Sequence, residues 1–245
     1  MIAASARRAR WLASSLIAAA AMHPLAMAQT IQPAPIFPAA AERVVAPEAE
    51  RAAQESAGAQ AAIFAGGRYW SATAVFSHVS GVDTVTPGYI GVQQRGALSL
   101  GPFRGPRPRA VPLPAEAVRV TYDPAKIRYD QLLRIYFTVL VDPTQRDGQG
   151  PDKGSKFRAA LVPTSQEQLL VASAYLSQMR ASELWALPIA TRIETGRSFT
   201  PAEPAPAQTP GGNSRQPATD GVAAPKLALL RRHFPQFYKA GFTPE

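Results

Sequence analysis

The side chains with the most scope for chemistry follow a pair of glycines, Gly66-Gly67, in the run Arg68-Tyr69-Trp70. Arg68 cannot act as a nucleophile, because its guanidinium stays protonated and offers no lone pair suited to attack. It could instead bind an anion at the start of a helix, where backbone N–H groups point outward, or pair with a carboxylate of this chain. Tyr69 and Trp70 could hold an apolar group of a ligand or pack into the core.

Reactive groups of two other kinds are scarce. The chain has no cysteine, which excludes a thiol nucleophile, a disulfide and a thiolate-bound metal. The three histidines, His23, His78 and His233, are far apart and lack the spacing of metal ligands. The sequence therefore predicts no metal site, no cofactor and no serine–histidine triad.

Two carboxylates are candidates for the same site. Glu116 begins an alternating segment, and Asp152 lies in a polar, glycine-rich loop over residues 142–156. Either could pair with Arg68, since guanidinium and carboxylate match in geometry. Beside Arg68 the pKa of Glu116 is expected to fall, which would leave it ionised and unable to donate a proton. Asp152 could anchor its loop by hydrogen bonds or contact a ligand.

The elements that must position these residues follow from hydrophobic periodicity and turn residues. Strands are expected over residues 61–65, 82–89, 116–122, 157–162 and 189–194, and helices over 69–78, 129–141, 164–180 and 227–233. The run Thr164-Ser165-Gln166-Glu167 is interpreted as a capping box for the third helix. The order of these strands and helices along the chain predicts an α+β fold, a two-layer ferredoxin-like sandwich with a mixed sheet.

The N-terminus is typical of an exported protein. Three arginines precede an apolar stretch too short to span a bilayer, and a small-x-small cleavage site, Ala26-Met27-Ala28, follows it. Residues 1–28 are therefore predicted to be a signal peptide, with the Sec route favoured over the twin-arginine route, and the protein to be periplasmic or secreted. Removal of the signal peptide takes away three arginines and no acidic residue, so the net charge of the chain falls from +9 to +6.

Composition divides the rest of the chain. The segments are an Ala/Pro-rich linker over 29–58, a domain over 59–200, a disordered Pro-rich insertion over 201–225, and a C-terminal helix and tail over 226–245. A proline–arginine loop within the domain, Arg104–Arg109, could bind an anionic partner or simply be solvated. No further stretch is apolar enough to span a membrane, and no basic helix or aromatic–basic ladder points to nucleic acid.

Four ordered blocks resemble the A-type peptide-methionine sulfoxide reductases. The first block, Ala61–Phe76, matches the family pattern A-x-F-x-x-G-C-F-W-x-x-E, and the second, Gly81-Val82 with Gly88-Tyr89, matches P-G-V and G-Y-x-G. The third block, Ala115–Pro124, matches H-A-E-A-V-x-V-x-Y-D-P. The fourth, Asp142–Arg158, matches H-D-P-T-Q followed by Q-G-N-D-x-G-x-Q-Y-R-S. The resemblance covers roughly residues 61–200, and more weakly 225–238. It implies an α+β two-layer domain with a pocket for the methyl sulfoxide of oxidised methionine.

The resemblance also implies a chemistry. In that family a cysteine thiolate attacks the sulfoxide sulfur, a carboxylic acid and two tyrosines hydrogen-bond its oxygen, and an aromatic pair holds the methyl group. The oxygen leaves only once it is protonated, so the acid must be neutral, and an apolar pocket raises its pKa. On this sequence the matching acid is Glu116, the aromatic pair is Tyr69 and Trp70, and Asp152 is the retained loop acid.

The sequence departs from the pattern at the decisive positions. Arg68 stands where the nucleophilic cysteine is expected, and no resolving cysteine exists. Thr73 stands where the first block of the pattern has its glutamate, and Pro114 stands where the pattern has a histidine before the acid. Phe157 stands where the pattern has the tyrosine of the Asp152 loop. The proline–arginine loop, which should supply the other tyrosine, shows no match.

Two hypotheses of different classes follow. The first is a non-catalytic binding module that uses Tyr69, Trp70, Glu116 and Asp152 for methionine or methionine sulfoxide side chains of proteins, for a small anion at Arg68, or for a partner's loop. The second is a peptide-methionine (S)-S-oxide reductase that acts on oxidised methionine by an unexpected route. The missing nucleophile favours the first, because removal of a nucleophile costs orders of magnitude in rate.

Overall fold

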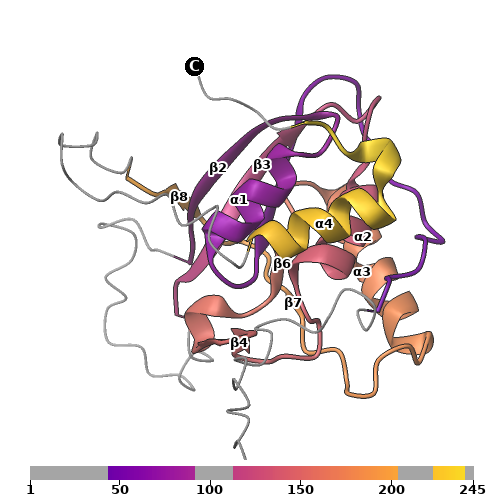
Figure 1. Ribbon diagram of the computed structural model, residues 1–245. Coiled ribbons are helices and arrows are strands. Elements are labelled where there is room, and N and C mark those ends of the chain that lie inside the picture. The colour runs from indigo at the N-terminus through magenta and orange to yellow at the C-terminus, as the bar shows by residue number, and fades with distance from the viewer. Residues whose placement is uncertain (1–43, 92–112, 204–222, 241–245) are drawn as a thin grey trace, which may run out of the picture. The chain divides into compact units, whose positions relative to one another are not determined.

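The structure, a computed structural model, describes residues 44–91, 113–203 and 223–240 (Figure 1). The predicted signal peptide, the Arg104–Arg109 loop and most of the predicted 201–225 insertion lie outside these ranges.

A mixed six-stranded sheet forms the centre of the fold, in the order β7-β6-β1-β3-β2-β8. Its strands are β1 (Gln60–Ala65), β2 (Val82–Ile90), β3 (Ala115–Tyr122), β6 (Ala160–Val162), β7 (Arg192–Ile193) and β8 (Phe199–Pro201). Neighbouring strands run antiparallel, except β6 and β7, which are parallel. Because β3 lies between β1 and β2, the connection through helix α1 (Tyr69–Ser77) is a split βαβ unit. The predicted α+β, ferredoxin-like fold is confirmed.

The helices pack on one face of the sheet. They are α1, α2 (Tyr129–Ile135), which continues as the π-helical turn η1 (Tyr136–Leu140), α3 (Gln166–Ala181) and α4 (Ala223–His233). Helix α1 packs over β2 and β3, and α4 lies beside α1 and packs against η1 (Figure 1). Phe64 of β1 and Val118 and Val120 of β3 face this layer, and the Phe64 ring stacks on Phe76 of α1 at 5.0 Å. The opposite face carries a smaller cluster that includes Ile63, as the two-residue period of a strand requires.

The shorter elements account for most differences from the predicted ones. They are the β4–β5 hairpin (Gly148–Gln149 and Asp152–Lys153), the 3₁₀ turn η2 (Ser155–Phe157) and the 3₁₀ turn η4 (Pro235–Phe237). The strand predicted over 157–162 therefore begins only at Ala160, and the strand predicted over 189–194 is reduced to β7. Strand β8 was not predicted, because three residues ending in a proline carry no alternation signal and pair only at the sheet edge.

The predicted capping box of α3 is wrong by one residue. Ser165 is the N-cap, and its Oγ accepts a hydrogen bond from Gln168 N at 3.1 Å. The Glu167 carboxylate instead accepts hydrogen bonds from the Arg51 side chain and from Gln54 N. A segment far away in sequence thus competes with the local motif for the same oxygens.

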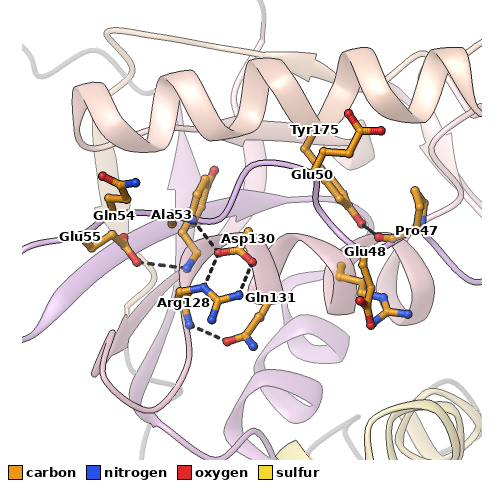
Figure 2. Close-up of polar contacts among 12 residues, drawn as sticks. Pro47, Glu48, Glu50, Ala53, Gln54, Glu55, Arg128, Asp130, Gln131 and Tyr175 are labelled. Atoms are coloured by element: carbon orange, nitrogen blue, oxygen red, sulfur yellow. Dashed lines mark hydrogen bonds and ion pairs between the residues drawn. The ribbon is translucent and has the colours of Figure 1, made fainter.

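That segment is the N-terminal strap, residues 44–57, for which composition predicts a linker. It follows an extended path along α2 and α3 before it enters β1 (Figure 2). Ala53 is buried, and its N–H donates to Asp130 Oδ1 at 2.8 Å. The Tyr175 hydroxyl donates to Pro47 O at 2.7 Å. An extended chain without sheet partners must find hydrogen bonds for its backbone elsewhere, and side chains of the helices supply them.

Candidate functional site

The turn between β1 and α1 positions the centre of the candidate site. Gly66 lies so close to Val141 that a Cβ at this position would overlap the Val141 side chain. Gly67 has a φ of 72°, a left-handed conformation that favours glycine, and its N–H donates to Phe157 O at 3.0 Å. The turn is therefore held between the end of η1 and the loop that carries Asp152.

Arg68 is the N-cap residue of α1, with extended backbone and no hydrogen bond from its side chain to the helix. Its Nε donates to Asp152 Oδ1 at 2.9 Å, and the two side chains are 58% and 17% exposed. Of the two carboxylates proposed from the sequence as partners, Asp152 is thus the one that pairs with Arg68. An ion pair this exposed contributes at most about 1 kcal/mol, so the pair orients Arg68 more than it stabilises the fold.

Glu116, the second residue of β3, is half-buried beside the first turn of α1. Its Oε2 accepts a hydrogen bond from Tyr69 N at 3.1 Å. Burial raises the pKa of Glu116, and this effect outweighs the Tyr69 hydrogen bond and the charges of Arg68 and Lys156, which lower it. The expectation that Arg68 lowers the pKa below its ordinary value is therefore wrong, because Arg68 is directed to Asp152 and its charge is largely solvated.

Three aromatic rings gather next to this carboxyl group. The rings of Tyr69 and Trp70 are 4.9 Å apart, and the Tyr89 ring meets Tyr69 edge-on at 5.7 Å. Burial, together with the neighbouring Tyr89, raises the pKa of Tyr69 to about 12. The Tyr69 hydroxyl therefore keeps its proton at neutral pH and can donate a hydrogen bond.

Tyr89 is the site residue that the sequence analysis missed. It pairs directly with Glu116 across β2 and β3, and side chains at such positions lie on the same face of a sheet. The available signal was the Gly88-Tyr89 match to G-Y-x-G. The register between β2 and β3, which the sequence does not reveal, was needed to bring Tyr89 to the acid.

Two of the replaced positions are satisfied within the protein. The Thr73 hydroxyl donates to Tyr69 O at 2.9 Å, one turn back along α1. Phe157 is only 4% exposed, and its ring lies 5.4 Å from the Arg68 Cζ. Thr73 therefore offers no carboxylate, and Phe157 offers no hydroxyl, in place of the side chains that the pattern expects.

The described residues show no other centre for chemistry. Within residues 44–91, 113–203 and 223–240, no group of three His, Cys, Asp or Glu side chains could hold a metal ion. His78 Nδ1 lies 2.7 Å from Ala74 O, and its ring stacks on Tyr238. In the same ranges, no helix is both long and apolar enough to cross a membrane.

Comparison with known proteins identifies the family. The sequence profile described as "Peptide methionine sulfoxide reductase" matches residues 60–208, more than half of the chain. This chain belongs to the peptide methionine sulfoxide reductase family. The matched range contains Arg68, Glu116 and Asp152.

Individual members of the peptide methionine sulfoxide reductase family are similar over most of their length. Peptide methionine sulfoxide reductase MsrA 2 of Mesorhizobium japonicum is 38% identical over 74% of this chain and 90% of its own length. Peptide methionine sulfoxide reductase MsrA of Deinococcus radiodurans is 37% identical over 74% of this chain and 85% of its own. Among solved structures, the reduced form of Mxr1 from Saccharomyces cerevisiae aligns with a TM-score of 0.48 and 20% identity, over 80% of this chain and 98% of that one.

Proposed function

We propose that this chain is an exported, non-catalytic member of the family, which binds oxidised methionine side chains of proteins and does not reduce them. The observation that carries the proposal is that an aromatic cluster and a half-buried carboxyl group lie together at a site without a nucleophile. The aromatic rings and Glu116 gather at the start of α1, while Arg68, at the nucleophile position, is engaged with Asp152. Export rests on the signal peptide predicted over residues 1–28.

The proposed absence of reductase activity follows from the two electrons that reduction of a sulfoxide requires. Reduction to the thioether needs a nucleophile at sulfur and two electrons, which in this family's chemistry come from thiols. The chain has no cysteine, and the Arg68 guanidinium cannot attack sulfur. Any turnover would consume two external thiols, which form one disulfide and release one water.

The binding of a sulfoxide follows from the groups that remain. Tyr69, Trp70 and Tyr89 offer apolar surface to the methyl group, worth about 0.8 kcal/mol when fully buried. Glu116, whose pKa is raised by burial, and the Tyr69 hydroxyl are the candidate donors to the sulfoxide oxygen. At about 0.5–1.5 kcal/mol for each hydrogen bond, two donors would favour sulfoxide over thioether by about 5- to 150-fold.

Calorimetric titration with blocked peptides tests this proposal. Each peptide carries one central methionine, either reduced or as the (S)-sulfoxide. The oxidised peptide should bind and the reduced peptide should bind at least about fivefold more weakly. Glu116→Ala, which removes one of the two donors, should weaken this preference, while Asp83→Ala, which removes an exposed carboxylate on β2, should leave it unchanged. Equal binding of both peptides by the unaltered protein would count against a methionine sulfoxide receptor.

Reductase activity is the second candidate function, and one observation favours it. Burial raises the pKa of Glu116, which is the direction that favours a proton donor, and external thiols could in principle supply the electrons. An assay on free and peptide methionine (S)-sulfoxide with dithiothreitol separates the two functions. We expect no turnover above the uncatalysed reaction; turnover that Glu116→Ala abolishes would replace the binding module by an enzyme.

A further inference from the structure

Two cationic side chains lie close to the ring of Phe157. The Arg68 Cζ is 5.4 Å from the ring centroid, and the Lys156 Nζ is 4.7 Å from it. The ring itself is almost fully buried, while both cationic side chains are largely exposed. Two positive charges thus meet at the surface over one buried ring.

All three residues stand at positions where this chain departs from the pattern that it otherwise matches. The pattern has cysteine where Arg68 stands, and its Q-Y-R run has glutamine and tyrosine where Lys156 and Phe157 stand. These replacements are about 90 residues apart in sequence and come together in space. Together they put two positive charges beside the pocket, where the pattern has none.

Of these two cations, Arg68 has an ion-pair partner and Lys156 does not, among the residues that the structure describes. The partner of Arg68 is Asp152. Glu116, the other carboxylate nearby, is half-buried and accepts its hydrogen bond from Tyr69 N. Cation–π contacts contribute only about 0.5–1 kcal/mol at exposed sites and leave the positive charge in place. An anionic group of a ligand would therefore be attracted to this corner of the site.

We propose that Arg68, Phe157 and Lys156 form a carboxylate-binding subsite beside the methionine sulfoxide pocket. The inference rests on the proposed function and specifies the ligand: oxidised methionine with a carboxylate close to it in the chain. A guanidinium can offer a carboxylate paired N–H donors, and an ammonium adds a point charge. The carboxylate can come from an acidic neighbouring side chain or from a free C-terminus, and the test distinguishes the two.

The test compares peptides of equal length and blocked ends, each with one central methionine (S)-sulfoxide flanked by Glu, Gln or Lys. The Glu-flanked peptide should bind about fivefold more tightly than the Gln-flanked one, as expected for one or two partly exposed ion pairs, and the Lys-flanked one should bind most weakly. The preference should shrink as NaCl is raised, because salt screens exposed charges. A peptide ending in methionine sulfoxide, with a free or an amidated C-terminus, tells whether the main-chain carboxylate also binds.

Variants assign the preference to the subsite. Lys156→Gln should bring the affinities for the Glu- and Gln-flanked peptides to within about twofold of each other. Arg180→Gln, which removes an exposed cation on α3, should leave the ratio of the two affinities at its original value.

The outcomes separate this subsite from the proposed function. Equal affinity for all three oxidised peptides would overturn the carboxylate subsite and leave the sulfoxide pocket standing. A preference for acidic peptides with no preference for the oxidised form would overturn the proposed function and support the subsite. Failure of every peptide to bind would overturn both.

Discussion

Arg68 Nε lies 2.9 Å from Asp152 Oδ1, while Glu116 receives its hydrogen bond from the Tyr69 backbone. The positive charge at the nucleophile position is thus turned to the loop acid and away from the acid next to the aromatic rings. As a consequence, burial dominates the pKa of Glu116 and raises it. The site therefore combines the absence of a thiol with a carboxyl group whose pKa is raised, and this combination makes sulfoxide binding without reduction testable.

Reintroduction of the nucleophile alone should restore little activity. Arg68→Cys puts a thiol at the start of α1, but Phe157 still lacks a hydroxyl, and the loss of one donor to a reacting oxygen costs about 10²- to 10³-fold in rate. The rate on peptide methionine (S)-sulfoxide with dithiothreitol should stay at least about 100-fold below that of active relatives. The double variant Arg68→Cys/Phe157→Tyr should be faster. A single variant that works at the relatives' rate would show that the missing hydroxyl is unimportant.

Sulfoxide binding should weaken as pH rises. Because the folded-state pKa of Glu116 is raised above its ordinary value, the protonated donor is present below that pKa and is lost as pH rises through it. Calorimetric titration between about pH 5 and pH 8, above the ordinary glutamate value of about 4.3, should show a falling affinity for the oxidised peptide. Glu116→Gln keeps a neutral donor and should flatten this dependence; an affinity that increases with pH would refute the role of the protonated acid.

Removal of Arg158 should destabilise the fold. Arg158 donates from Nε and Nη2 to the Glu194 carboxylate at 2.7 and 3.0 Å, and both side chains are buried. Burial alone would raise the pKa of Glu194, but the hydrogen bonds and charge of Arg158, together with the charges of Arg197 and Arg192, outweigh burial and lower it. Arg158→Met leaves the buried Glu194 carboxylate with Arg197, at 3.2 Å, as its remaining ion-pair partner. Because the two Arg158 hydrogen bonds are lost, the free energy of unfolding should fall by about 1–3 kcal/mol, measured by urea denaturation.

The same pair predicts an acid-dependent stability. Since the folded-state pKa of Glu194 is lowered, its contribution is present above the ordinary glutamate value and is lost as pH falls through the folded-state pKa. Arg158→Met should therefore lose less stability than the unaltered protein on acidification. As a control, Arg180→Met on the exposed side of α3 should change stability by no more than about 0.5 kcal/mol at neutral pH.

The N-terminal strap should depend on Asp130. This buried carboxylate accepts the Ala53 N–H and two hydrogen bonds from Arg128, as Figure 2 shows. Asp130→Ala leaves the strap amide without its partner and should cost about 1–3 kcal/mol of unfolding free energy. Limited proteolysis should then cut within the strap sooner. Asp83→Ala, which removes an exposed carboxylate, is the matched control, and equal losses for the two variants would argue against a specific role for the strap.

Much of the fold could be predicted from the sequence, because the long elements carry strong local patterns. The alternation of β3 and the apolar run of α2 depend on residues within a few positions of one another. Short elements such as β8 and the strap could not be predicted, because they are stabilised by partners far along the chain and have no pattern of their own. The large sequence separation also explains why the hydrogen bonds from Arg51 and Gln54 to Glu167 could not be predicted.

By itself, the sequence determined that the chain has no thiol, that an arginine stands at the nucleophile position, and that the four blocks of the family pattern occur in order. These are properties of composition and of neighbouring residues. Only the tertiary structure decided that Arg68 pairs with Asp152, 84 residues away, and that Tyr89 joins Glu116 across β2 and β3. It also reversed the expected direction of the Glu116 pKa shift, because burial depends on the segments that fold around a side chain and not on its neighbours in sequence.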